Sequence, residues 1–197
     1  MRKLEVFFDY HCPYCLKGHD QLIQFIQEQL QLAQEQSAQR QLVREQSEQV
    51  QRGLEIIWHP CEIGKLKNFT RTEHTDICAQ GLFFALDIAN SMRNSPDKID
   101  IWQYHQKVYD LIFKDRANVS DVNVLSKALE GILDVGAFRE AIKSGKYNER
   151  VNDSNQYAFQ ETGIHVVPTY RVDGGFLQDR QEFFNMGPSS TSYNQAK

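Results

Sequence analysis

The junction between residues 4–8 and residues 12–15 constrains the fold of this chain more than any other part of its sequence. A run typical of a β-strand leads into Cys-Pro-Tyr-Cys, and a helical pattern begins at that point. We therefore expect a helix with Pro13 at or beside its first position, where the missing N–H costs no hydrogen bond. Cys12 then lies at the helix N-terminus, and Cys15 lies one turn further on, within disulfide reach.

This placement predicts different properties for the two cysteines. Unpaired backbone N–H groups and the positive end of the helix dipole favour a thiolate at Cys12. We therefore expect Cys12 to be more exposed and more acidic than Cys15. A sulfur that ionises easily, beside one that can resolve a mixed disulfide, is the working part of a thiol–disulfide oxidoreductase.

Two other interpretations of the pair are open. It could form half of a zinc site with Cys61 and Cys78, although those two do not form a second closely spaced pair and a proline between ligands is unusual. It could also be structural. Free cysteines usually behave as small buried apolar residues, and we expect that of Cys61 and Cys78.

Composition bounds the class of protein. The chain has 197 residues, of which 41% are hydrophobic and 24% charged, as in an ordinary soluble globular protein. A formal net charge of −4 without a basic patch argues against nucleic acid as a partner. We find no secretory signal and no apolar window of about 18 residues, so we expect no membrane span and a cytoplasmic location. An exported protein from which the signal had been removed would have the same sequence features.

A Gln-rich stretch follows the cysteines. Leu22, Ile26, Leu30 and Ala33 form an apolar stripe at helical spacing. The next strand candidate is residues 54–59. A helix that continued up to it would be about 55 Å long and would extend tens of ångströms past the start of a strand pairing in parallel with the first. We therefore expect the helix to break around residues 36–39. A solvated extension is the plain interpretation, and a coiled-coil arm that joins a homodimer is the functional alternative.

The second half begins with helices and ends with strands. Helical patterns extend from about residue 72 to 147, with Ser95-Pro96 as an expected helix start. His74 and His105 have no partner at metal-ligand spacing, so we expect no metal site. A further helix, about residues 148–161, precedes a strand that begins near Pro168 and a hairpin turn at residues 173–175.

The Cys-Pro-Tyr-Cys junction, the helical block and the late Val-Pro-Thr at residues 167–169, taken together, resemble the DsbA-like thioredoxin-fold family. The closest likeness is to its cytosolic FrnE-type branch, in which an Asp precedes the first Cys by three residues, as Asp9 precedes Cys12. The resemblance covers nearly the whole chain. It departs from the family at Val166, where Gly is frequent, and in the Gln-rich stretch. Pro13-Tyr14 is typical of glutaredoxins and lacks the histidine of strongly oxidising periplasmic members.

The resemblance implies an α/β, thioredoxin-like fold with an inserted all-helical domain. The thioredoxin-like domain would comprise residues 1–64 and 148–186, with a Gln-rich helical excursion at about 34–52. The inserted helical domain would comprise residues 65–147, and residues 187–197 would form a flexible tail.

The resemblance also implies roles for single residues. Cys12 would be the attacking thiol and Cys15 the resolving thiol. Pro168, after a cis bond, would face the pair within van der Waals reach, and Val167 would offer backbone groups to a peptide added as a short strand. Pro13 and Tyr14 would also contact the substrate, and Asp9 and His11 would tune the reactivity of the pair.

The expected function is therefore reduction or isomerisation of disulfides in protein or small-molecule substrates. No cofactor is needed beyond the redox-active pair, with glutathione as a candidate co-substrate and thiols or disulfides of proteins and peptides as partners. The alternative is a glutathione-dependent isomerase or transferase of the kappa-class or hydroxychromene-carboxylate type. Such enzymes carry Ser at the position of Cys12. A non-enzymatic binding module that uses the Gln-rich arm is a third interpretation.

Overall fold

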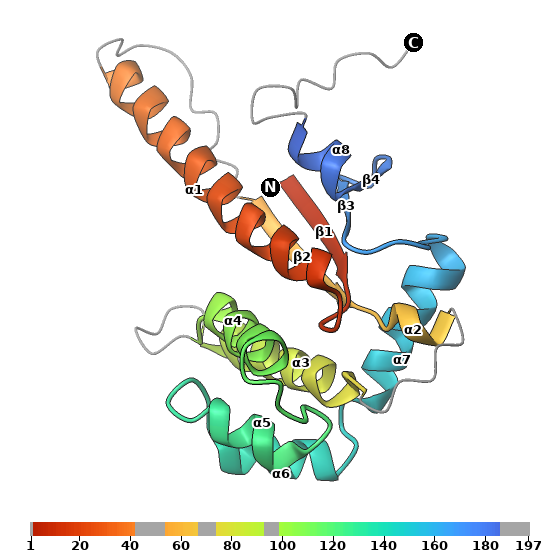
Figure 1. Ribbon diagram of the computed structural model, residues 1–197. Coiled ribbons are helices and arrows are strands. Elements are labelled where there is room, and N and C mark those ends of the chain that lie inside the picture. The colour runs from red at the N-terminus through yellow and green to blue at the C-terminus, as the bar shows by residue number, and fades with distance from the viewer. Residues whose placement is uncertain (1, 42–53, 67–73, 93–98, 186–197) are drawn as a thin grey trace.

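The fold is built on a four-stranded mixed sheet with helices on both faces (Figure 1). The computed structural model describes residues 2–41, 54–66, 74–92 and 99–185. In this part of the chain the strand order is β2 (Leu54–Pro60), β1 (Arg2–Phe8), β3 (Thr169–Val172) and β4 (Leu177–Asp179). β1 is parallel to β2 and antiparallel to β3, which pairs in turn with β4 across the predicted hairpin. The predicted strands and the parallel pairing of the first two are confirmed.

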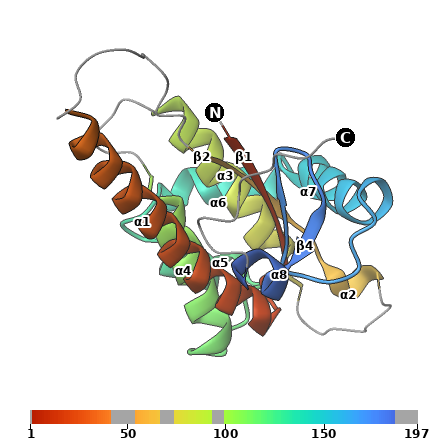
Figure 2. The ribbon, with the colours of Figure 1, turned by 90° about the horizontal axis from the view of Figure 1, so that it is seen from above.

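Helix α1 (Pro13–Gln41) begins at Pro13, as predicted, and crosses the sheet. Leu22 is fully buried and Ile26 is half-buried, so the start of the apolar stripe packs as expected; the side chains of Leu30 and Ala33 lie outside the described residues. The predicted break at residues 36–39 is wrong, because the helix continues to Gln41 and projects beyond the sheet (Figures 1 and 2). Gln, Glu, Ala and Arg have good helix propensity and need no packed partner to extend a helix already formed.

The remaining helices pack around the sheet and cover the core (Figure 2). They are α2 (Ile63–Leu66), α3 (Asp76–Ser91), α4 (Ile101–Phe113), α5 (Val122–Ala128), α6 (Val135–Lys143), α7 (Asn148–Gln156), the π-helical turn η1 (Tyr157–Glu161) and α8 (Arg180–Asn185). Helices α3 to α6 pack against one another. In the sequence they lie between β2 and α7, where the helical block was predicted. The exact domain boundaries stay predictions, and the predicted tail at residues 187–197 lies outside the described residues.

Short polar side chains begin three of these helices. Asp100, Asp121 and Asp134 each accept hydrogen bonds from N–H groups of the first turn of α4, α5 and α6. The expected start of α4 at Ser95-Pro96 is therefore wrong, since the cap is Asp100; Ser95 and Pro96 themselves lie outside the described residues. Aspartate caps a helix as well as serine does. The residue types alone therefore could not decide whether Ser95 or Asp100 is the cap.

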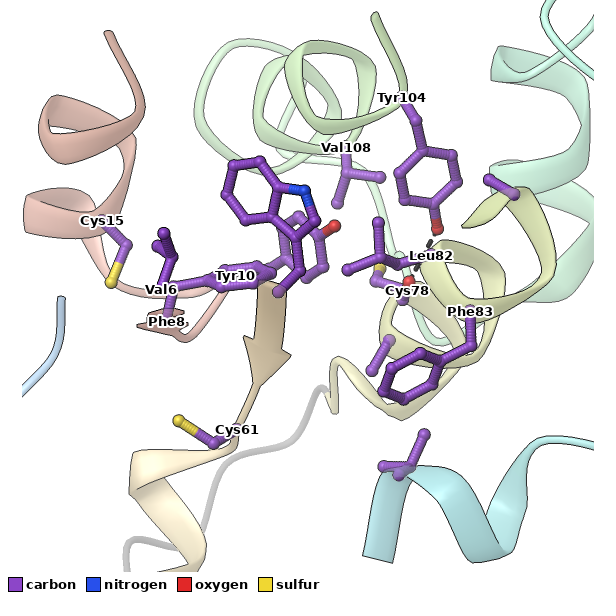
Figure 3. Packing of buried hydrophobic residues seen from close by; sticks show 14 of the residues in the cluster. Val6, Phe8, Tyr10, Cys15, Cys61, Cys78, Leu82, Phe83, Tyr104 and Val108 are labelled. Atoms are coloured by element: carbon purple, nitrogen blue, oxygen red, sulfur yellow. Dashed lines mark hydrogen bonds between the residues drawn. The ribbon is translucent and has the colours of Figure 1, made fainter. Parts of the chain in front are cut away.

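One core joins the sheet to the helical block. Figure 3 shows Val6 and Phe8 of β1 beside Cys15 of α1, with Tyr104 of α4 against α3. The Tyr104 hydroxyl donates to the carbonyl oxygen of Cys78 at 2.7 Å, so its polar group is satisfied within the core. This continuity places the start of α1 against both the sheet and α4.

A partly buried ion pair joins β1 to β3 on the face of the sheet opposite Val6 and Phe8. Arg171 binds both carboxylate oxygens of Glu5, at 2.6 and 2.7 Å, and the Tyr157 hydroxyl donates to the same carboxylate at 2.9 Å. His59 Nε2 lies 3.2 Å from Glu5 Oε1. Although burial raises the pKa of Glu5, the hydrogen bonds from Arg171 and Tyr157 lower it below its ordinary value.

In the described part of the chain, no helix combines the length and apolar character needed to cross a membrane.

The close approach of α1 to β3 generates a prediction at Gly18. A Cβ atom at this position would meet the Tyr170 hydroxyl oxygen, and would lie 2.9 Å from Cγ of Pro168. We expect Gly18→Ala to lower the free energy of unfolding by roughly 1–3 kcal/mol, because the packed neighbours must move apart. Urea denaturation measures the change.

The matched control is Lys17→Ala on the exposed side of the same turn, expected to change stability by no more than about 0.5 kcal/mol. Equal stability of Gly18→Ala and the unmodified protein would contradict this packing.

Candidate functional site

The cysteine pair lies at the turn from β1 to α1, and the side chain of Asp9 holds that turn. Asp9 is buried, and its carboxylate accepts from the backbone N–H of His11 at 2.9 Å and of Ile63 at 3.1 Å. Its carbonyl oxygen accepts from the N–H of Cys12 at 3.0 Å. The turn is therefore fixed locally and also tied to the start of α2.

Cys12 has the properties of a reactive thiol. It is half-buried at the N-terminus of α1, and its Sγ lies 3.5 Å from the carbonyl oxygen of Val167. A hydrogen bond from the Cys15 side chain, helped by the N–H groups of Cys15 and Tyr14, lowers the pKa of Cys12 from 9.0 to about 7, against the opposing effects of burial and of the Asp9 charge. The lowered pKa increases the thiolate fraction of Cys12 at neutral pH.

Cys15 has the opposite character. It is 2% exposed, and its Sγ accepts from the N–H of Asp9 at 3.5 Å. Burial, and the hydrogen bond that it donates to Cys12, raise the pKa of Cys15 well above its ordinary value. The predicted difference between the two cysteines, in exposure and in acidity, is confirmed. Both are free thiols here.

The loop before β3 lies against the pair, as the sequence indicated. The Val167–Pro168 bond is cis, which confirms that prediction, and the carbonyl oxygen of Val167 faces Cys12. Van der Waals contact between Pro168 and the two sulfurs stays a prediction. Tyr14 is 60% exposed and Val166 is 55% exposed, so apolar side chains from two segments reach solvent near Cys12.

A small cavity lies behind Cys15. Its walls come from α1, β1, β2, α4, β3 and the loop before β3. The lining residues are Val6, Phe8, Cys15, Gly18, His19, Leu22, Trp58, His105, Tyr109, Pro168 and Tyr170. The rings of His19 and His105 are 5.4 Å apart, and both side chains are buried. Burial lowers the pKa of His19 to about 4 and that of His105 well below its ordinary value, so both imidazoles are neutral at pH 7.

The other two cysteines are buried thiols. Cys61 follows β2, and its N–H donates to the carbonyl oxygen of Phe8 at 2.8 Å. Burial raises the pKa of both Cys61 and Cys78, so neither is a nucleophile at neutral pH. Within the described ranges, no three His, Cys, Asp or Glu side chains are grouped so as to hold a metal ion.

Comparison with solved structures gives the fold. The structure is similar to a probable DsbA oxidoreductase from Streptomyces coelicolor, with a TM-score of 0.66 and 15% identity over 100% of this chain and 93% of the other. It is also similar to DsbA of Chlamydia trachomatis, with a TM-score of 0.60 and 16% identity over 94% and 82% of the two chains. The chain has the DsbA-like thioredoxin fold. This confirms the predicted fold class.

Two further comparisons bear on relatives. A 2-hydroxychromene-2-carboxylate isomerase structure matches with a TM-score of 0.60 and 12% identity, over 93% of this chain and 92% of the other. Among curated proteins, the uncharacterized protein YwbO of Bacillus subtilis (strain 168) is 24% identical in an alignment of 183 residues that covers 86% of this chain and 86% of the other. No protein-family model matches the sequence.

Sequence reasoning found the residues of the turn but missed the wall behind Cys15. His19 follows Cys15 by four residues, a spacing that puts the two side chains on one face of a helix and could have drawn attention to it. His105 and Trp58 carried no such signal, because only the packing of α4 and β2 brings them to the site.

The pKa difference generates a labelling prediction. In the native protein, the rate of iodoacetamide alkylation at Cys12 should rise with pH through a midpoint near 7, because only the thiolate reacts. Cys15, Cys61 and Cys78 should remain unlabelled over the same time, since all three are buried and their pKa values are raised. Peptide mass spectrometry of samples quenched at each pH measures both rates.

Cys12→Ser is the control, and it should remove the fast labelling without transferring it to Cys15. Equal labelling of the two cysteines in the unmodified protein would contradict the assignment of Cys12 as the acidic thiol.

Proposed function

We propose that this protein is a thiol–disulfide oxidoreductase that reduces or isomerises disulfides through the Cys12–Cys15 pair. The observation that carries the proposal is the contrast within the pair: a half-buried thiol with a pKa of about 7 lies beside a buried thiol with a raised pKa. The DsbA-like thioredoxin fold around this pair supports the same chemistry.

The reaction follows from that contrast. The Cys12 thiolate attacks one sulfur of a substrate disulfide, a new S–S bond forms, and the other substrate sulfur leaves as a thiolate. Cys15 then attacks Cys12 Sγ, its proton is lost, and the second substrate sulfur leaves with the electron pair of the mixed disulfide. The substrate gains two electrons and the pair becomes a disulfide. Isomerisation requires only the first step and its reversal at another sulfur.

The exposed surroundings of Cys12 suit a peptide substrate. Val167 lies next to Cys12 and would present its backbone to an extended chain, with Pro168 behind it. Pro13 and Tyr14 would contact the substrate from α1, where both are exposed. Val166 stands where glycine is frequent in the family, and its side chain is exposed. It would reduce the space for a peptide beside Cys12 and favour substrates with apolar residues next to their cysteine.

Asp9 and His11 are the proposed tuning residues. The charge of Asp9 raises the pKa of Cys12 and so opposes the hydrogen bonds that lower it. His11 is joined to Asp9 through its backbone N–H, next to Cys12 in the sequence. We propose that this balance keeps Cys12 less acidic than in strongly oxidising relatives.

The proposed setting is the cytoplasm, as in the FrnE-type branch that the sequence resembles. The proposed partners are thiols and disulfides of proteins or peptides, with glutathione as a co-substrate and no bound cofactor. The part of α1 that projects beyond the sheet supports a homodimer as a further proposal.

The alternative function is a glutathione-dependent isomerase or transferase. The observation in its favour is the similarity to a 2-hydroxychromene-2-carboxylate isomerase structure over most of both chains. The two cysteines weigh against it, because enzymes of that type carry Ser at the position of Cys12. Binding to immobilised glutathione without dithiol activity would support the alternative.

Insulin reduction in the presence of dithiothreitol tests the proposed function. The protein should accelerate the precipitation of reduced insulin chains, and Cys12→Ser should lower the rate by roughly 100-fold or more, because the attacking thiolate is lost. Cys78→Ala, a buried thiol outside the site, is the matched control and should retain the activity. Equal rates with and without Cys12 would contradict the proposal.

The redox potential is a second measurable consequence. Neither residue between the two cysteines, Pro13 or Tyr14, has a side chain that can carry a positive charge. We therefore expect a potential of roughly −180 to −250 mV, overlapping the glutaredoxin range. Equilibration with glutathione buffers, followed by tryptophan fluorescence, measures it.

Tyr14→His should raise the potential, because a nearby positive charge stabilises the Cys12 thiolate relative to the disulfide. A value near about −120 mV for the unmodified protein would instead indicate a net oxidant.

A further inference from the structure

The buried imidazole of His19 packs against the rings of Trp102, His105 and Tyr109, but this packing does not use its two ring nitrogens. The side chain is 5% exposed, and neither ring nitrogen has a hydrogen-bond partner among the described residues. A neutral imidazole always carries one N–H donor and one acceptor, so both groups are desolvated here. A buried polar group without a hydrogen-bond partner destabilises the folded protein unless something in the site satisfies it.

The cavity behind Cys15 can satisfy it. His19 and Cys15 lie one turn apart on the buried side of α1, and both line this cavity. Its volume is about 10 Å³, at the lower limit of the space that one water molecule needs. His105 also lines it with Nε2 unpartnered within the described chain, while its Nδ1 lies 2.9 Å from the Tyr10 hydroxyl. Cys15, His19 and His105 therefore line one water-sized space. Val6 and Phe8 line it too, and Figure 3 shows both beside Cys15.

The resolving step needs a proton acceptor at this place. Cys15 must lose its proton as its sulfur attacks Cys12, but it is buried and its thiol is weakly acidic. Direct contact with bulk water is therefore blocked at the moment of reaction. We propose that His19 is the internal proton acceptor for Cys15, acting through a water molecule in the cavity behind it.

This inference rests on the proposed function and adds a residue to its second step. The Cys15 lone pair forms the bond to Cys12 Sγ, and the S–S bond to the substrate breaks, with its electron pair leaving on the substrate sulfur. The Cys15 proton passes to the cavity water, which gives one of its own to a ring nitrogen of His19. The imidazolium then loses that proton to bulk water, and the substrate disulfide supplies the oxidising equivalents.

The environment explains why His19 accepts a proton only transiently. Its pKa of about 4 keeps the ring neutral, with a free lone pair, at the start of the step. Negative charge growing on Cys15 stabilises the imidazolium in this low-dielectric site, and the effect ends when the disulfide has formed.

The tyrosines and the carboxylate around the pair do not compete with His19, and the His105 ring is engaged at Nδ1 by the Tyr10 hydroxyl, 2.9 Å away. The titratable groups around the pair come from the turn before α1, from α4 and from β3: Asp9, Tyr10, Cys12, His105, Tyr109 and Tyr170. Burial raises the pKa of Tyr10, Tyr109 and Tyr170, so these hydroxyls stay protonated. The carboxylate of Asp9 is held by the N–H groups of His11 and Ile63.

Stopped-flow reaction with excess dithiobisnitrobenzoate, an aromatic disulfide that releases a coloured thiolate, separates the two steps. The first release reports attack by Cys12 and is proportional to reagent concentration. The second reports attack by Cys15 and does not depend on it. We expect His19→Phe to slow the second phase by about tenfold or more and to leave the first within about twofold.

The pH profile separates proton transfer from a packing defect. In the unmodified protein the second phase should vary little between about pH 6 and 9. In His19→Phe it should rise about tenfold per pH unit, because hydroxide replaces the internal acceptor. His19→Gln, which retains polar groups for the water but cannot take up a proton, should show the same steep profile. Leu82→Val truncates the buried core of α3 away from the cavity and should leave both phases unchanged.

An unchanged second phase in His19→Phe, or equal slowing in Leu82→Val, would overturn the role of His19 while the two-step reaction stands. Absence of any release from the unmodified protein would overturn the proposed function and this inference together.

Discussion

The candidate site depends on the hydrogen bonds that the buried carboxylate of Asp9 accepts from backbone N–H groups. This carboxylate fixes the turn between β1 and α1 through the N–H of His11 and anchors that turn to α2 through the N–H of Ile63. With the turn fixed, Cys12 takes the helix N-terminus, where backbone N–H groups stabilise its thiolate. The same carboxylate is a negative charge beside the pair and raises the pKa of Cys12. One residue thus provides the geometry and limits the acidity that the geometry creates.

The contrast within the pair is an effect of burial more than of sequence position. Cys12 and Cys15 are one turn apart on the same helix, but the helix leans on the sheet and on α4, so only the second cysteine is enclosed. Enclosure favours the neutral thiol and makes Cys15 a donor to Cys12, which is the largest cause of the lowered pKa of Cys12. The same enclosure separates the Cys15 proton from bulk water, and His19 lines the cavity next to Cys15.

The helical block contributes to the site as well as to the core. His105 and Tyr109 of α4 form one side of the cavity behind Cys15, and Trp58 of β2 packs against the ring of His105 with 4.3 Å between ring centroids. Residues from five elements therefore surround one buried sulfur. In contrast, the surface around Cys12 consists of Tyr14, Val166 and backbone groups of the loop before β3, which leaves the attacking thiol accessible to a substrate.

Local signals let the sequence alone determine the strand–helix junction, the order of the strands and helices, and the place of Cys12, because a proline at a helix start and an i to i+3 spacing act within one or two turns. The resemblance added the cis bond before Pro168. The sequence misplaced the end of α1, since the argument assumed that a helix must stop where its packing stops. Only the tertiary structure decided that Arg171 pairs with Glu5, that Asp9 reaches Ile63, and that His19 and His105 meet behind Cys15. These contacts join segments far apart in the chain, and burial, which shifts the pKa values, exists only after those segments have packed together.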